Sequence, residues 1–449
     1  MSFLENLPNL APAVDALFAK WDKPDSAGCT VAVIHDGQVI YKKGFGIANL
    51  EYGVVNEPGT IYHVASISKQ FTAFAVQLLA AERKLSLDDD VRKYVPELHD
   101  YGYRITLRHL IHHTSGLRDQ WNLLGLAGWR SGDVITEDDI LNVVWRQREL
   151  NSEPGTEKNY CNTGYTLLGL ITKRVSGLSL RQFCHERIFA PLGMKRTHFH
   201  DDNTEIVKGR AYGYSQHSSG EFDNFPLQYA NVGATSLFTT VEDMALWDRN
   251  FDSPTIGDAA LLTEMHKVGV LNSGVELDYA SGLGIGHYRG LRTVGHDGAD
   301  AGFRSTYQRF PDQKLSVVIL ANLSSFEPNL LARQIAEIFL GNLMSIPEDD
   351  QTESPTESPA FHLESDRHRD YVGDYYSQEL GVIFTISEGP EQLSLQFPKG
   401  VVSLQPTEND AFNAHPIGIM TFERSNGAIT GFRLDNGRVR RLLFESWRR

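Results

Sequence analysis

The stretch HVASISKQFTAFAVQLLAAE, residues 63–82, predicts an amphipathic helix whose first turn carries a serine and a lysine. Apolar residues recur at helical spacing from Phe71 to Leu79. We expect the helix to begin near Ser66, which puts Lys69 one turn further along and on the same face. If Ser66 only caps the helix, Lys69 is a solvated side chain, so the rest of the chain decides between these two interpretations.

The composition is that of a globular protein without a surface for nucleic acid or anionic lipid. The 449 residues, 41% hydrophobic and 22% charged, exceed a typical single domain and favour two. A net charge of −15 argues against a basic stripe that would bind phosphates. No stretch approaches the roughly 18 apolar residues of a membrane span, and the N-terminus predicts an amphipathic helix instead of a signal peptide. We therefore expect a cytoplasmic protein that binds neither nucleic acid nor membrane.

Neither the cysteines nor the histidines form a recognisable metal motif. The three cysteines are far apart in the chain, so we expect neither a disulfide framework nor a Cys-x-x-Cys site, and a reducing compartment. His112, His113 and His266 stand in no His-Glu-x-x-His or comparable pattern. We expect no metal and no cofactor.

Strand patterns at both ends of the first 345 residues enclose a mostly helical region. Two apolar runs around Asp36-Gly37 predict a hairpin and hence an early antiparallel sheet. Between Glu57 and about Met194 helical patterns predominate, and from about Leu291 the chain returns to strands and then to a helix. The expected fold is α/β of the α+β type, an antiparallel sheet flanked by terminal helices with an all-helical insertion.

Residues 346–360, IPEDDQTESPTESPA, predict an exposed linker, because they are rich in Pro, Glu, Ser and Thr and lack apolar periodicity. Beyond it, short strand patterns separated by Asn-Gly turns indicate an up-and-down β-barrel or a sandwich. We expect a first domain of residues 1–345 and a small C-terminal all-β, lipocalin-like barrel of residues 361–449. No chemistry is recognised in the second domain.

Three short motifs follow one another along the chain: Ser66-Ile67-Ser68-Lys69, Tyr160-Cys161-Asn162 and His296-Asp297-Gly298. A serine hydroxyl is a poor nucleophile near pH 7 without an adjacent base, and a desolvated lysine can lose its proton. A nearby tyrosine can share the proton transfer, and an asparagine amide can orient a substrate carbonyl together with the lysine. These residue types predict a nucleophilic serine with proton-transfer groups around it.

The order of these motifs resembles that of the penicillin-recognising serine hydrolases, and most of all their class C β-lactamase-like and D-aminopeptidase-like branch. Further stretches that resemble this branch are ITLRHLIHHTSGL (105–117), PGTEKNYCNTGYTLLG (154–169), APLGMKRTHF (190–199), GATSLFTTVEDMALW (233–247) and GHDGADAGF (295–303). The resemblance covers roughly residues 10–345. It implies a β-lactamase/transpeptidase-like fold and chemistry through an acyl-serine intermediate.

The resemblance also implies roles for single residues. Ser66 matches the nucleophile, Lys69 the proton-relay lysine, and Tyr160 the general base that later acts as an acid. Asn162 matches the amide that orients the substrate. The backbone N–H groups of Ser66 and Ala299 would form the oxyanion hole.

The third motif departs from the Lys-Thr-Gly of many β-lactamases and DD-peptidases. His296 is mostly neutral at pH 7 and Asp297 adds a negative charge, so we do not expect this motif to anchor a substrate carboxylate. Gly298 would let its strand approach the substrate closely. If Asp300 faces the site, its carboxylate would favour a free α-amino group on the substrate. The alternative is that both aspartates are turn residues directed to solvent, which we prefer for Asp297.

Two of the motifs occur a second time. Tyr229-Ala230-Asn231 precedes a Gly-rich stretch and follows no Pro-Gly turn into a helix, so we favour Tyr160. His35-Asp36-Gly37 lies at the predicted hairpin tip, where Asp-Gly alone accounts for it.

The sequence therefore predicts a serine hydrolase of amide or ester bonds that acts on small molecules or short peptides, with D-amino acid peptides, amides or esters favoured. Acyl transfer to an amine or alcohol would use the same residues and stays open. We expect weak or negligible β-lactamase activity, although a true β-lactamase is a further alternative. A non-enzymatic binding module is disfavoured because all three motifs keep proton-handling groups. Oligomeric state, exact substrate and the role of the C-terminal domain stay open.

Overall fold

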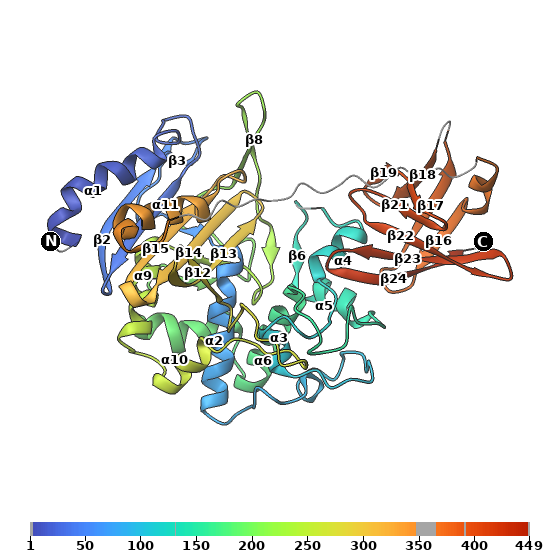
Figure 1. Cartoon of the computed structure of the whole chain (residues 1–449), viewed down its shortest axis with the longest axis horizontal. Helices are drawn as coiled ribbons and strands as arrows, with labels where there is room; N and C mark the ends of the chain where they lie inside the picture. Colours follow the sequence, from blue (N-terminus) through green and yellow to red (C-terminus); the bar gives the residue numbers. More distant parts are fainter. Residues whose placement is uncertain (1–2, 131, 347–364, 390–391, 448–449) are drawn as a thin grey trace.

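The computed structural model describes residues 3–130, 132–346, 365–389 and 392–447 (Figure 1). Its central feature is an antiparallel sheet of six strands in the order β12-β13-β14-β15-β1-β2. The strands are β1 (Cys29–His35), β2 (Gln38–Phe45), β12 (Gly284–Tyr288), β13 (Leu291–Asp300), β14 (Phe303–Phe310) and β15 (Leu315–Ala321). Strands from the two ends of this part of the chain therefore pair at the centre of one sheet, where β1 lies against β15.

Helices cover both faces of this sheet. Successive residues of β1 alternate between two apolar clusters, because side chains along a strand point to opposite faces. One face is covered by α1 (Phe3–Phe18) and α11 (Pro328–Leu340), and α9 (Val241–Asp252) packs on the other (Figure 1). The predicted arrangement of an antiparallel sheet flanked by terminal helices is confirmed.

The predicted hairpin joins β1 and β2. Asp36 and Gly37 both have positive φ angles, 48° and 72°, which a two-residue turn between twisted strands requires. The β12 strand was not predicted, because its sequence is rich in glycine and lacks the alternation that marks a half-buried strand.

The helical region is larger than predicted. Its helices are α2 (Ser68–Ala81), α3 (Leu107–Ile111), α4 (Gln120–Leu126), α5 (Glu137–Trp145), α6 (Asn162–Ser176), α7 (Leu180–Cys184), α8 (Ala190–Leu192), α9 and α10 (Ala259–Met265). The last two follow Met194, where the sequence analysis ended the insertion. Short strands also occur in and around it: β3 (Ile47–Asn49), β4 (Val54–Val55), β5 (Tyr62–His63), β6 (Ile135–Thr136), β7 (His198–Phe199), β8 (Tyr214–Gln216), β9 (Phe222–Asn224), β10 (Tyr229–Ala230) and β11 (Leu237–Thr239).

The C-terminal part is a nearly closed, barrel-like sheet of nine strands, so the predicted all-β barrel is confirmed. Its strands are β16 (Gly373–Ser377), β17 (Val382–Glu388), β18 (Leu393–Phe397), β19 (Gly400–Ser403), β20 (Gln405–Glu408), β21 (Ala411–Asn413), β22 (Ile419–Ser425), β23 (Ala428–Asn436) and β24 (Val439–Trp447). Each strand pairs with the next strand in sequence, except that β19 and β20 do not pair and form the two edges of the sheet. The first strand, β16, also pairs with the last, β24. Figure 1 shows this sheet (red) beside α4 and α5.

The predicted linker, residues 346–360, lies outside the described residues except for Ile346. The division into domains of residues 1–345 and 361–449 therefore stays a prediction. Among the helices of the described ranges, none has both the length and the apolarity needed to cross a membrane.

Candidate active site

Ser66 lies in a short 3₁₀ turn, Ala65–Ile67, which leads into α2. The helix begins at Ser68, two residues later than predicted. Ala65 has a φ of 47°, in the left-handed region that residues with a Cβ atom rarely adopt, so the backbone just before Ser66 is strained. Ser68 holds the turn in place: its hydroxyl donates to the carbonyl of Ala65 (2.6 Å) and accepts from the backbone N–H of Leu237 (3.0 Å).

Lys69 is fully buried and points at Ser66. Its Nζ donates to Oγ of Ser66 (3.0 Å), to Oδ1 of Asn162 (2.8 Å) and to the carbonyl of Ala234 (2.7 Å). Burial lowers the pKa of Lys69 to about 7, and the nearby carboxylate of Asp119 opposes this shift. Both the charged and the neutral amine are therefore present near neutral pH, and the neutral amine can accept a proton.

Asn162 is the first residue of α6 and is oriented by Asp119. One oxygen of that carboxylate, Oδ2, accepts from both the backbone N–H (2.7 Å) and the side-chain Nδ2 (2.8 Å) of Asn162. The amide oxygen is thereby left facing Lys69. Asp119 is fully buried, and it also accepts from the backbone N–H of Trp121 at the start of α4. The sequence analysis missed Asp119, whose only signal is an aspartate in front of a helical pattern.

Tyr160 lies against both Ser66 and Lys69. Nζ of Lys69 lies 4.9 Å from the centroid of its ring, and Ser66 is near enough to its hydroxyl to lower the pKa of the phenol in part. Burial raises the pKa of Tyr160, so the phenol stays protonated near neutral pH. The ring of His113 packs on one side with a centroid separation of 4.2 Å. The guanidinium of Arg438, from the C-terminal sheet, lies 4.9 Å from the ring centroid, and sequence analysis had found no chemistry in that sheet.

The third motif lies on β13, which passes close to the turn that carries Ser66. A Cβ atom on Gly298 would lie 2.3 Å from both the carbonyl oxygen of Val64 and Oγ of Ser305, so only glycine fits between them. Oγ of Ser305 in turn donates to the carbonyl of Val64 (2.9 Å). Ala299 follows directly on the same strand and is exposed. The strand therefore approaches the turn that carries Ser66 more closely than any other residue at position 298 would permit.

His296 is a neutral ring in this site. Its Nε2 lies 3.0 Å from the hydroxyl of Tyr279, and its Nδ1 lies 2.6 Å from the carbonyl of Asp297. Burial and the charge of Lys69 lower the pKa of His296 to about 4. A cavity of about 480 Å³ opens beside it and is lined by Tyr160, Tyr279 and His296 among others.

The preferred interpretation of Asp297 as a turn residue directed to solvent holds for its exposure but not for the turn. Asp297 lies within β13, opposite Thr306, and its carboxylate accepts from Thr306 Oγ1 (2.6 Å) and from Asn329 Nδ2 (2.7 Å). The strand continues to Asp300, two residues beyond the motif. A motif that resembles a turn in sequence is therefore part of a paired strand.

Asp300 is the last residue of β13, and its side chain is 16% exposed, so it is not directed to solvent. Its carboxylate accepts from the hydroxyls of Tyr229 (3.2 Å) and Thr235 (3.0 Å), and Nε2 of His63 lies 3.4 Å away. The charge of Asp300 is near enough to Lys69 to favour the charged amine. The second Tyr-x-Asn motif thus contributes Tyr229 to the surroundings of Asp300, whereas Tyr160 is the tyrosine at Ser66.

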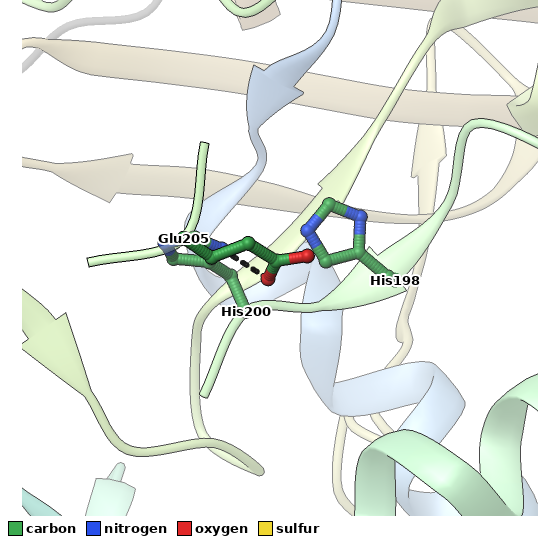
Figure 2. Close-up of side chains that lie close together, drawn as sticks. All are labelled: His198, His200 and Glu205. Atoms are coloured by element: carbon green, nitrogen blue, oxygen red, sulfur yellow. Dashed lines mark ion pairs between the residues drawn. The ribbon is translucent and has the colours of Figure 1, made fainter. Parts of the chain in front are cut away.

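A group of possible metal ligands lies elsewhere, and the sequence analysis did not consider it. Figure 2 shows His198, His200 and Glu205, whose donor atoms lie within 4.8 Å of one another. Both carboxylate oxygens of Glu205 are already bound by the guanidinium of Arg181, at 2.6 and 2.7 Å. Burial lowers the pKa of His200 to about 4. The arrangement is that of an ion pair packed against neutral histidines.

Comparisons with known proteins show the family of the chain. A family model described as Beta-lactamase matches residues 14–339. A D-aminopeptidase of Cereibacter sphaeroides is 28% identical over 397 residues, which cover 88% of this chain and 72% of the relative. A D-aminopeptidase of Brucella melitensis is 26% identical over 408 residues, 90% of this chain and 74% of the relative.

Solved structures share the fold. The octameric penicillin-binding protein homologue from Pyrococcus abyssi has a TM-score of 0.66 and 26% identity, over 98% of this chain and 99% of that chain. The D-amino acid amidase from Ochrobactrum anthropi SV3 has a TM-score of 0.62 and 23% identity, over 75% of this chain and 99% of that chain. The first of these similarities extends over the C-terminal sheet as well.

Proposed function

The chain belongs to the Beta-lactamase family and is a serine hydrolase, and we propose that it cleaves the amide bond after an N-terminal D-amino acid residue. The observation that carries the proposal is the environment of Lys69. A fully buried amine with a pKa of about 7 lies 3.0 Å from the hydroxyl of Ser66, which is the pairing that an activated serine nucleophile requires. The D-aminopeptidase relatives support the substrate class.

Acylation begins when Oγ of Ser66 attacks the substrate carbonyl carbon and its proton passes to neutral Lys69. The oxyanion that forms accepts hydrogen bonds from the backbone N–H groups of Ser66 and Ala299. The C–N bond then breaks, and Tyr160 donates its proton to the departing nitrogen and regains one from Lys69. The products of this step are a free amine and an acyl-serine ester.

Deacylation repeats these transfers with water in place of the amine. A water molecule attacks the ester carbon and gives its proton to neutral Lys69. The bond between the acyl carbon and Oγ of Ser66 then breaks, and Oγ takes a proton from Tyr160, which regains one from Lys69 as the acid leaves. The resemblance to the penicillin-recognising serine hydrolases implies that Tyr160 is the general base. The raised pKa of Tyr160 favours Lys69 as the first proton acceptor, with the tyrosine as the group that passes the proton on.

Asp300 is the candidate partner of the substrate's α-ammonium group. Its carboxylate is mostly buried, and opposite charges attract more strongly away from water. The hydroxyls of Tyr229 and Thr235 hold it in place from the side. Asn162 and His296 complete the proposed substrate-binding set, the first through its amide and the second as a neutral ring beside the cavity.

We also infer the domain boundaries, an activity on esters and the cellular location. Residues 1–345 and 361–449 are proposed to be separate domains joined by the linker 346–360. Ester hydrolysis would use the same acyl-serine chemistry. A cytoplasmic location is supported by Cys29, Cys161 and Cys184, all buried and free, as is usual in a reducing compartment.

The proposal is tested with D-alanyl and L-alanyl p-nitroanilides and a fluorophosphonate probe. We expect turnover of the D-substrate, a label on Ser66 alone, and loss of both in Ser66→Ala. Ser219→Ala is the control, because this serine is exposed and its hydroxyl bonds the carboxylate of Glu221, away from the turn that carries Ser66. A label on another serine, or equal turnover of the two enantiomers, would contradict the proposal.

A further inference from the structure

The turn between β23 and β24 of the C-terminal sheet contacts the active site through its backbone. The carbonyl of Arg438 accepts from the backbone N–H of Asp119 (3.1 Å) and from Nδ2 of Asn151 (2.9 Å). Oδ1 of Asn151 in turn accepts from the backbone N–H of Arg440 (2.7 Å). The residue that orients Asn162 is therefore also bonded to the backbone of Arg438.

The buried side chain of Arg118 binds two residues at the start of β24, directly after this turn. The guanidinium of Arg118 donates to the carbonyls of Arg440 and Arg441, at 3.1 Å each, and pairs with Glu379 at 2.5 Å. The side chain of Arg118 is 0% exposed. Five hydrogen bonds to Arg118, Asp119 and Asn151 thus hold the turn and the start of β24 in front of α4. The ion pair attaches the connection between β16 and β17 to the same arginine.

The side chain of Arg438 is an exposed cation over Tyr160, 4.9 Å from the ring centroid. Contact with the ring face leaves the N–H groups at the edge of the guanidinium available. Within the described parts of the chain it has no carboxylate partner. By contrast, the neighbouring Arg433 and Arg440 are paired with Glu149 and Glu157.

Among the residues that the structure describes, no other cation near Tyr160 is free to bind a substrate. Lys69 already has three acceptors, His296 is neutral, and Lys158 is paired with Asp278. An arginine presents its donors in a planar fork that matches a carboxylate. The position of Arg438 over Tyr160 thus favours a substrate that carries an anionic group close to the nitrogen that Tyr160 protonates.

We propose that Arg438 is a substrate-binding residue that takes the carboxylate of the leaving amino acid, so that short peptides with a free C-terminus are preferred substrates. This inference rests on the proposed function, in which Tyr160 protonates the departing nitrogen. In an amino acid leaving group the carboxylate carbon is two bonds from that nitrogen, so the guanidinium over the same tyrosine lies on the side where the carboxylate emerges. The C-terminal sheet would then supply the charge that the His296 motif lacks.

The test compares D-alanyl-glycine with D-alanyl-glycinamide, which differ only in the carboxylate. We expect the wild type to prefer the acid, and Arg438→Gln to lower kcat/KM for the acid about tenfold or more, mainly through KM. For the amide the change stays below about threefold, because a charged hydrogen bond is absent there. Arg440→Gln is the matched control: it removes an arginine of the same turn whose partner is Glu157, and it keeps the wild-type ratio.

A second pair of probes separates this inference from the proposed function. A phenyl phosphonate ester and its 3-carboxyphenyl counterpart react by forming a P–O bond to Ser66 and releasing a phenol, so only the nucleophile is needed. Arg438→Gln should slow the carboxylated probe selectively. If no D-aminoacyl peptide is cleaved, the proposed function is wrong. The two phosphonates still show whether Arg438 binds a carboxylate. Equal slowing of both probes, or no change in either, would overturn the role of Arg438.

Discussion

At the scale of single residues, the burial of Lys69 governs the chemistry. An amine that is 0% exposed loses the hydration that stabilises its charge, and three acceptors at 2.7–3.0 Å do not restore it completely. The pKa of about 7 is the result. A surface lysine beside Ser66 would stay charged and could not accept its proton.

We predict that kcat/KM for D-alanyl p-nitroanilide rises with pH through about 7, because the neutral form of Lys69 is the competent one. Lys69→Arg should be inactive at every pH, since a guanidinium does not lose its proton in this range. Lys158→Arg is the control: it preserves a charge paired with Asp278 near the site and should keep the wild-type profile. An active Lys69→Arg enzyme would contradict the assignment.

The same shift affects stability. The folded-state pKa of Lys69 lies below its ordinary value of 10.5, so between about pH 7 and 10.5 the unfolded chain binds more protons than the folded one. The contribution of Lys69 to the free energy of unfolding therefore rises with pH across this window. Urea titrations of the wild type and of Lys69→Met at several pH values measure this contribution. The free energy of unfolding of the wild type minus that of the variant should rise toward alkaline pH.

Sequence could indicate Ser66, Lys69, Tyr160, Asn162 and the third motif as candidates, because their residue types and order are local information. It could not indicate Asp119 or Arg438. An aspartate before a helix and an arginine after Asn-Gly are common in any protein. Their roles become apparent only when the fold places Asp119 beside Asn162 and Arg438 over Tyr160.

At the scale of elements, the contact between β13 and the turn before α2 decides whether the site forms. The sequence predicted both elements from their apolar patterns, but the strand that contains Asp297 was expected to end in a turn. Its pairing with β14 depends on partners such as Thr306, and no pattern within the motif itself reveals them. The late start of α2 has a similar origin, because Leu237 from a distant strand holds Ser68 at the turn.

We predict that Gly298→Ala destabilises the protein by about 1–3 kcal/mol and lowers kcat by about a hundredfold. The added Cβ atom would lie 2.3 Å from the carbonyl of Val64, so either β13 or the turn of Ser66 must move. Thermal unfolding and turnover of the D-alanyl anilide measure the two effects. Gly286→Ala is the matched control on β12, where the nearest atom would be Thr293 Oγ1 at 3.5 Å, and it should leave both nearly unchanged.

At the scale of the whole molecule, the candidate active site lies where two sheets that are far apart in sequence come together, with Arg438 of the C-terminal sheet over the ring of Tyr160. The sequence predicted each of them, the mixed α/β part from its helices and strands and the barrel from its short strands. It did not predict their contact, because a turn joined to loops by backbone hydrogen bonds leaves no periodic pattern. The pair of Arg118 and Glu379 is a buried charged link across this contact.

We predict that Arg118→Ala destabilises the protein by about 3–5 kcal/mol, because it leaves the carboxylate of Glu379 buried without its partner. The double variant Arg118→Ala/Glu379→Ala should be less destabilised than the sum of the single ones, since no unpaired charge is left. Arg174→Ala removes an exposed pair with Glu97 and should cost less than about 1 kcal/mol. Urea denaturation of the wild type, the two single variants, the double variant and Arg174→Ala measures these free energies. If the contact also positions Arg438, Arg118→Ala should reduce the preference for D-alanyl-glycine over its amide, whereas Arg174→Ala should not. An unchanged preference in a folded Arg118→Ala variant would show that the turn keeps its place without Arg118.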